Sequence, residues 1–232
     1  MLRTTAYVLT VAALALSPIY LWSSGLPQLS HLSMAAAIGV HALALLCAPI
    51  PWRPWWRWAL LFAGYTLCVN TLVYIQYRDV HTLLSATYYV FNALVWLHLV
   101  GLSNAVGKER FLRVVYLTLW VLLSLEVFLV ATGRGRMYNI SRAMGTFNDP
   151  NQMAHWLIWA AVLLAAVGWA LHRTWAPGMI ATGLATLGLA FSSSRSGALG
   201  LAVILLVYGL MALKALGRCV RNPGAIRVAP VV

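Results

Sequence analysis

The chain has 232 residues, of which 62% are hydrophobic and only 9% are charged, and its formal net charge is +12. Its apolar residues come in runs of about 17 to 23, the length that a helix needs to cross a bilayer, which indicates an integral membrane protein and excludes a soluble one. Lys and Arg are scattered singly and in pairs between these runs, as membrane topology requires, and they form no basic stripe, so we exclude nucleic acid as a partner.

Eight apolar segments predict an all-α, polytopic bundle of about eight transmembrane helices. In chain order they cover residues 5–22, 32–50, 56–73, 80–102, 111–131, 154–171, 176–191 and 197–216. The first segment has the character of a secretory signal, but Pro18 follows the expected cleavage point and the apolar run continues, so we expect an uncleaved span. The segments predict five spans in 1–131, three in 132–217 and a basic cytoplasmic tail in 218–232.

Positive charge predicts the side of the membrane on which each connection lies, since Lys and Arg resist translocation. With the N-terminus and the C-terminus in the cytoplasm, eleven of the 16 basic residues fall on inner segments. These are Arg3, Arg53, Arg57, Lys108, Arg110, Arg113, Arg173, Lys214, Arg218, Arg221 and Arg227. The outer loops keep Arg78, Arg134, Arg136, Arg142 and Arg195. The last four lie on the side of the membrane where Lys and Arg are disfavoured, so we expect them to have a function.

The loop before the sixth segment reads TGRGRMYNISRAMGTFNDPNQMAHW, residues 132–156. Gly145 permits a tight turn, Asn148 or Asp149 can cap the coming helix, and Pro150 suits its first turn. The free N–H groups and the dipole of that helix predict an anion site at the outer interface. An ordinary helix start is the alternative interpretation of this turn.

Candidate binding groups lie on both sides of that turn. Arg134, Arg136 and Arg142 precede it, and the planar fork of an arginine suits bidentate binding of phosphate. Asn151 and His155 follow it four residues apart, so they share one face of the helix. Interfacial anchoring by the arginines and a structural hydrogen bond of the histidine stay open as alternatives.

A second polar turn, FSSSRSGALG at residues 191–200, follows the short, glycine-rich seventh segment. Arg195 there is costly below the interface unless it is paired or faces a watery cavity. Gly197 and Gly200 would let the eighth helix pack closely against a neighbour. Snorkelling of Arg195 to lipid phosphates is the alternative. If the seventh segment did not cross, the two arginine-bearing turns would lie on opposite faces of the membrane.

Few other polar groups lie inside the predicted spans. Glu126 in the fifth is either a functional acid or a protonated carboxyl that is bonded to a neighbouring helix. We expect His41, Asn70, Asn92 and His98 to form hydrogen bonds between helices.

The two polar turns together resemble a known family. RAMGTFNDPNQMAHWL, followed about forty residues later by SSSRSGALGL, resembles the O-antigen ligase and O-antigen polymerase superfamily of bacterial inner-membrane proteins. The resemblance covers roughly residues 134–212. Gly145, Asn148, Pro150, Asn151 and Ala154 stand at the family's spacing.

The resemblance implies a multi-span, inverting glycosyltransferase at the periplasmic face of the bacterial inner membrane. Its donor would be a glycan on undecaprenyl diphosphate, and its acceptor a hydroxyl of lipid A-core, of a polysaccharide or of a protein. Arg142 and Arg195 would hold the diphosphate without a metal or another cofactor. From their charge and place we add Arg134 and Arg136. The scarcity of outer carboxylates agrees with metal-independent chemistry.

The chain departs from the family at its end. Family members continue into a large periplasmic loop with a histidine that is regarded as catalytic, whereas this sequence stops soon after the eighth segment, so we expect a truncated copy or a second chain that completes the site. His155 and Asp149 are then the candidate bases. Two further functions stay open: non-catalytic binding or transport of an anionic lipid-linked sugar, and an inactive remnant.

Overall fold

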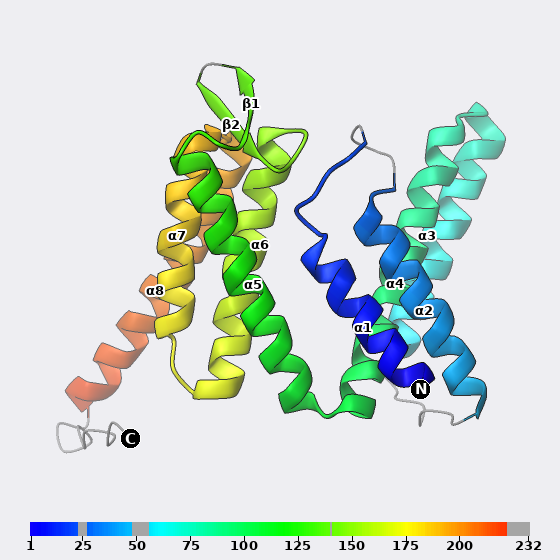
Figure 1. Cartoon of the computed structure of the whole chain (residues 1–232), viewed down its shortest axis with the longest axis horizontal. Coiled ribbons are helices and arrows are strands. Elements are labelled where there is room, and N and C mark those ends of the chain that lie inside the picture. Colours follow the sequence, from blue (N-terminus) through cyan, green and yellow to red (C-terminus); the bar gives the residue numbers. More distant parts are fainter. Residues whose placement is uncertain (23–26, 48–55, 140, 222–232) are drawn as a thin grey trace. The chain divides into compact units, whose positions relative to one another are not determined.

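The computed structural model describes residues 1–22, 27–47, 56–139 and 141–221, in which eight helices and a two-stranded hairpin form (Figure 1). Arg53 and residues 222–232 of the expected tail lie outside these ranges. The chain divides into two compact units, Met1–Leu119 and Trp120–Val232. We call them the N-terminal and the C-terminal unit.

The N-terminal unit packs its helices around small and aromatic side chains. It contains α1 (Leu2–Ala15), α2 (Leu29–Cys47), α3 (Trp56–Tyr77), α4 (Val80–Val106) and the first half of α5 (Lys108–Ala131). Helices α1 and α2 pack together and both contact α4, while α3 packs along α4. Ala6, Leu102 and Phe111 form a buried cluster in this unit. Ala6 is fully buried, and its small side chain lets the helices approach closely.

Helix α1 is shorter than the predicted first segment. It ends at Ala15, whereas the apolar run continues to Trp22. Pro18 accounts for the early end, because a proline lacks the N–H that continues a helix and disfavours helical geometry in the residue before it. With 14 residues, α1 is about 21 Å long, less than the hydrocarbon core of a bilayer.

Buried histidines connect the helices of this unit. The Nδ1 atoms of His41 on α2 and His98 on α4 lie 2.9 Å apart. The prediction of hydrogen bonds between helices is therefore confirmed for His41 and His98. It is wrong for Asn70, whose side-chain amide donates to the carbonyl of Thr66 at 2.8 Å within α3.

The C-terminal unit contains the rest of α5, the strands β1 (Arg136–Asn139) and β2 (Arg142–Gly145), and the helices α6 (Pro150–His172), α7 (Ala176–Ser192) and α8 (Arg195–Arg221). Helix α6 packs along α7 and contacts α8, and β2 contacts both α6 and α7. Small residues allow this packing: a Cβ added to Gly178 would lie 2.8 Å from the backbone of Ala165. The end of α7 and the start of α6 therefore meet at one end of the unit.

The strands are a difference from the sequence prediction, which placed an irregular loop there. They pair antiparallel, with Arg136 opposite Gly145 and Asn139 opposite Arg142, and the register is interrupted between these pairs. The side chain of Asn139 accepts a hydrogen bond from the backbone N–H of Ser141 at 3.0 Å, which favours the turn between the strands.

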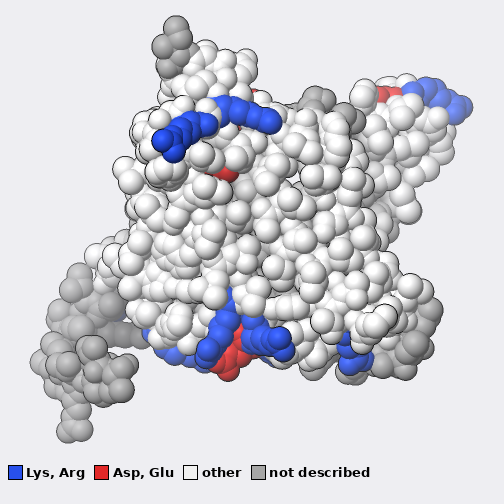
Figure 2. Space-filling model, in the orientation of Figure 1, with Lys and Arg blue, Asp and Glu red and all other residues white. Residues whose placement is uncertain are grey.

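Among the described residues, five helices are long and apolar enough to cross a membrane: α3, α4, α5, α6 and the Arg195–Lys214 part of α8. Helices α1, α2 and α7 are shorter apolar helices. In the view of Figure 2, Lys and Arg lie at helix ends in each unit, and the helix sides between them are uncharged. Uncharged sides suit contact with lipid chains. These features support a helical membrane protein.

Candidate functional site

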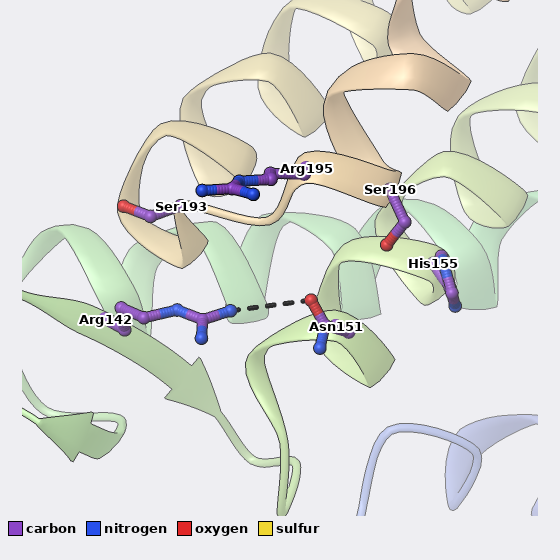
Figure 3. A pocket seen from close by; sticks show the side chains of 6 residues that line it. All are labelled: Arg142, Asn151, His155, Ser193, Arg195 and Ser196. Carbon is purple, nitrogen blue, oxygen red and sulfur yellow. Dashed lines mark hydrogen bonds between the residues drawn. The ribbon is translucent and has the colours of Figure 1, made fainter.

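One pocket in the C-terminal unit brings the two polar turns of the sequence together. It has a volume of about 630 Å³ and is lined by Arg142, Asn151, His155, Ser193, Arg195 and Ser196 (Figure 3). We call it the arginine pocket. Arg142 and Arg195, which are far apart in the sequence, thus lie at the same end of the unit, the arrangement required if α7 reverses the direction of α6.

The turn between α7 and α8 positions Arg195. Helix α7 ends because Ser193 adopts a left-handed conformation with a φ of 50° and donates its backbone N–H to Leu189. Ser194 is buried, and its hydroxyl accepts a hydrogen bond from the backbone N–H of Gly197 at 3.2 Å, as at a helix N-cap. Arg195 is consequently the first residue of α8.

Asn151 links the two turns. Its Oδ1 atom accepts a hydrogen bond from the hydroxyl of Ser194 at 2.9 Å and a longer one from the guanidinium of Arg142 at 3.4 Å. The Nε–H of Arg142 donates to the carbonyl of Ser192 at 3.1 Å. Figure 3 shows Arg142 reaching from β2 towards Asn151 on α6. Three segments are thereby held around one space.

The two arginines are held to different degrees. Arg142 also lies over the ring of Tyr138, with 5.7 Å between its Cζ atom and the ring centroid. Arg195 is exposed, and its guanidinium has no hydrogen bond or ion pair within the described residues. Arg142 is therefore a preorganised donor, whereas the donors of Arg195 are free to reach a ligand.

The charge of the lining favours an anion. The six residues carry two positive charges and no carboxylate. In a low-dielectric membrane interface, guanidinium groups form strong hydrogen bonds with phosphate oxygens. A diphosphate, which presents several such oxygens, matches this lining.

The two candidate bases have different surroundings. His155 lines the pocket one turn after Asn151, is exposed, and has no hydrogen bond among the described residues. Asp149 is the N-cap of α6: its carboxylate accepts from the backbone N–H groups of Asn151 at 2.7 Å and Gln152 at 3.3 Å. Asp149 is not among the lining residues.

The capping by Asp149 corrects one expectation. We expected the first N–H groups of α6 to be free for an anion, but Asp149 already occupies two of them. Its negative charge also offsets the helix dipole at that point. Pro150 is buried in the first turn, as its position predicts. Anion binding in the pocket thus depends on the arginines rather than on the start of α6.

The other two predicted arginines lie outside the lining of this pocket. The guanidinium of Arg134 lies over the ring of Phe128, 5.9 Å from its centroid. Arg136 donates a hydrogen bond to the side chain of Asn148 at 2.7 Å. Arg136 and Asn148 therefore connect β1 to the turn before α6.

Glu126 anchors the segment that carries Arg142. Its side chain is 1% exposed, and it accepts hydrogen bonds from the backbone N–H of Thr146, at 3.2 Å, and from the Thr146 hydroxyl. Gly145 lies against this carboxyl with a φ of 60°, and a Cβ at that position would collide with it. Of the alternatives for Glu126, a bonded carboxyl agrees with the structure, although its partner is the segment before α6.

Glycine also brings α8 close to the pocket. A Cβ added to Gly197 would lie 2.8 Å from the Cβ of Ala154 on α6 and 2.5 Å from the Cδ2 of Leu189 on α7. Such distances are shorter than normal contacts, so three helices meet closely at Gly197, two residues after Arg195.

Sequence reasoning did not assign a role to the serines of the second turn. Ser193 and Ser196 line the pocket, and the buried Ser194 contacts both Ser196, at 3.1 Å, and Asn151. Their position in the sequence could have indicated this role. Serines that flank an arginine in a turn between two apolar helices place hydroxyl donors beside that arginine.

Within the described residues, no group of three or more His, Cys, Asp or Glu side chains is placed to hold a metal ion. Comparisons with protein-family models, with curated proteins and with solved structures found no match for this chain. The functional assignment therefore rests on the sequence motifs and on the arginine pocket.

Proposed function

We propose that the arginine pocket binds the diphosphate of a glycan linked to undecaprenyl diphosphate, and that the protein transfers this glycan to an acceptor hydroxyl at the periplasmic face of the bacterial inner membrane. The activity would be similar to that of O-antigen ligases and polymerases. One observation carries the proposal: Arg142 and Arg195 line one pocket together with hydroxyl and amide donors.

The place of the pocket supports a lipid-linked ligand over a soluble phosphate. Arg195 begins α8, and Asn151 lies in the first turn of α6, and both helices are long and apolar enough to cross a membrane. The pocket is thus at helix ends, where the polar head of a lipid meets water while its chain remains in the hydrocarbon.

The chemistry asked of the pocket is stabilisation of a leaving group. The acceptor oxygen bonds to the anomeric carbon of the glycan, the bond from that carbon to the diphosphate oxygen breaks, and the carrier departs as the diphosphate. Negative charge grows on the departing oxygen, and fixed guanidinium groups stabilise it without reorganisation. Arg142, held by Asn151 and Ser192, suits this role.

A base has to take up the proton of the acceptor hydroxyl. His155 is the candidate base because it lines the pocket and its ring nitrogens have no partner within the described residues. A neutral imidazole with an unpaired ring nitrogen can accept the proton of a hydroxyl. Asp149 is less suited because its carboxylate already caps α6.

Binding or transport without transfer is the second candidate function. It is favoured by one observation: Asp149, the second predicted base, lies outside the lining and caps α6 instead. His155→Gln separates the two functions. Loss of transfer with unchanged binding of the carrier supports catalysis, whereas unchanged transfer excludes His155 as the base.

The proposal is tested with the full chain in nanodiscs and a labelled glycan on undecaprenyl diphosphate, with a panel of acceptors. Arg142→Ala and Arg195→Ala should each weaken carrier binding about 10- to 100-fold, since a hydrogen bond to a charged group contributes about 1.5–3 kcal/mol. Unchanged binding in both variants would refute the proposal.

A matched control removes a guanidinium elsewhere in the same unit. Arg173 follows α6 at its other end and adopts a left-handed conformation that suits glycine, so Arg173→Gly removes the charge without strain. Carrier binding should then change by no more than about twofold. An equal loss in this control would mean that net charge, rather than the pocket, attracts the carrier.

A further inference from the structure

A separate polar cluster lies in the N-terminal unit, where side chains from three helices meet. Thr10 on α1, His41 on α2 and His98 on α4 are exposed to only 4%, 2% and 3%. The Nδ1 atoms of the two histidines lie 2.9 Å apart, and the Nε2 atom of His98 lies 2.8 Å from the Thr10 hydroxyl. We call these three residues the histidine chain.

The hydrogen bonds of Thr10 determine which ring nitrogens of the histidine chain carry a hydrogen. The Thr10 hydroxyl donates to the carbonyl of Ala6 at 2.7 Å, so its oxygen accepts from the Nε2–H of His98. A neutral imidazole has one N–H, which leaves the Nδ1 atom of His98 as an acceptor. The Nδ1–H of His41 donates to it, and the Nε2 atom of His41 keeps an unshared electron pair.

That last nitrogen is buried and unsatisfied. Within the described residues, the Nε2 atom of His41 has no hydrogen-bond partner. Buried polar atoms are nearly always paired, because leaving one unpaired costs free energy. Ionisable groups inside membrane helices are also rare unless they act on protons, ions or substrates. An unpaired basic nitrogen at this place is therefore a site that can bind a proton or a metal ion.

We propose that the histidine chain is a proton-binding site, which holds α1, α2 and α4 together while both rings are neutral and loosens them when it takes up a proton. A proton on the Nδ1 atom of His98 would set two N–H groups against each other and break the link between α2 and α4. A proton on the Nε2 atom of His41 would create a buried positive charge.

The surroundings of the histidine chain do not compensate such a charge. The described sequences of α1, α2 and α4 contain no Asp or Glu. The charged and titratable groups that act on His41 from the two helices packed against it are Arg3 on α1, whose positive charge opposes protonation, and His98 on α4. Added charge is therefore relieved by separation of the helices and entry of water.

The geometry favours a proton over a metal ion. A metal between two imidazoles with bonds of about 2.0 Å needs the nitrogens further apart than the 2.9 Å observed. The described residues also supply no third His, Cys, Asp or Glu ligand. A shared proton fits the observed distance as an N–H···N hydrogen bond.

The site makes the N-terminal unit sensitive to acid. Imidazoles that are exposed to water take up protons near pH 6.5, whereas the hydrogen bonds of the histidine chain require both rings to be neutral. The unfolded state then binds more protons below that pH, so stability is retained above it and falls as the pH decreases. For each proton that only the unfolded state binds, the unfolding equilibrium constant rises by up to about tenfold for each unit by which the pH falls.

Nitrogen NMR of the full chain, labelled with ¹⁵N-histidine and held in detergent micelles, tests the proton positions directly. At about pH 7.5 we expect N–H at the Nδ1 atom of His41 and at the Nε2 atom of His98, with a coupling across the N–H···N bond, and loss of that coupling as the pH is lowered to about 4. Resonances are assigned with His41→Gln and His98→Gln. A coupling that persists to about pH 4, or is absent at about pH 7.5, would overturn the proposal.

A stability measurement tests the consequence. The melting temperature of the wild-type chain should fall between about pH 7.5 and about 5.5, and His41→Gln should remove about one proton from this dependence. The control is His81→Gln, since His81 is exposed near the start of the same helix as His98 and should keep the full dependence. The same slope in His41→Gln, or stabilisation by Zn²⁺ that requires His41, would refute proton binding. Both measurements are independent of the arginine pocket.

Discussion

Two glycines on α7 allow a direct test of the packing that sets up the arginine pocket. Gly178 faces α6: an added Cβ would lie 2.5 Å from the Cβ and 2.8 Å from the Cα of Ala165, and 2.7 Å from the hydroxyl of Tyr208. At Gly183, on the same helix, an added Cβ would have no atom within 4 Å among the described residues outside the neighbouring backbone of α7. The same substitution therefore meets backbone at one position and open space at the other.

The magnitude follows from these contacts. Gly178→Ala has to displace the α6 backbone, and overpacking of this kind costs about 1–3 kcal/mol. For a chain of this size that corresponds to a fall in melting temperature of roughly 2–12 °C. Gly183→Ala has no such clash and gains up to about 1 kcal/mol of helix propensity, so its melting temperature should be unchanged or higher.

Thermal unfolding of the detergent-solubilised chain, followed by tryptophan fluorescence, measures both variants under identical conditions. Carrier binding should weaken in Gly178→Ala, because α7 positions the turn that holds Arg195, and should be retained in Gly183→Ala. If the two variants have the same melting temperature, the close contact between α6 and α7 is wrong, and so is the explanation of how the two arginines meet.

Further substitutions separate structural from chemical roles at the pocket. Asp149→Asn should keep the helix cap and the activity, whereas Asp149→Ala should lose about 0.5–2 kcal/mol of stability; loss of transfer in Asp149→Asn with binding intact would instead identify a base. Glu126→Gln should retain a bond to Thr146, and Glu126→Ala should destabilise the fold by about 1–3 kcal/mol in chemical denaturation; equal stability of the two would contradict the anchoring role. Asn151→Ala should weaken carrier binding about tenfold through loss of its contacts to Arg142 and Ser194, measured as in the arginine variants, and unchanged affinity would remove Asn151 from the site.

The sequence predicted most of the helical layout because apolar runs of this length have few alternatives. All eight predicted segments correspond to helices, and α6 begins where the Asp149 and Pro150 signals place it. The end of α1 was less well predicted, because the apolar run extends past the point at which Pro18 ends the helix. The number of spans stays a prediction, since five helices are long and apolar enough to cross and three are shorter.

The site was predictable in its charges and less so in its contacts. Arg142 and Arg195 were predicted because they are positive charges on the outer side of the membrane, where Lys and Arg are disfavoured, and this can be recognised in the sequence. The role of Asn151 in linking their turns depends on the antiparallel packing of α6 and α7, which periodicity does not encode. The strand that carries Arg142 was missed because four residues with an interrupted register leave no clear alternation to detect.

Glu126 illustrates the same limit. Its presence in an apolar segment indicated an unusual carboxyl, but its partner is Thr146, in a segment whose position depends on the conformation of Gly145. The sequence shows that a carboxyl lies in an apolar segment, where it is energetically costly, but only the fold shows which groups donate hydrogen bonds to it.

The most direct test is a double-mutant cycle on binding of undecaprenyl diphosphate in nanodiscs, with Arg142→Ala, Arg195→Ala and the combined variant. If both guanidinium groups hold one diphosphate, each single variant weakens binding strongly, and the double variant deviates from the sum of the two free-energy losses by at least about 0.5 kcal/mol. Strictly additive losses, or a single variant that binds like the wild type, would contradict the shared pocket.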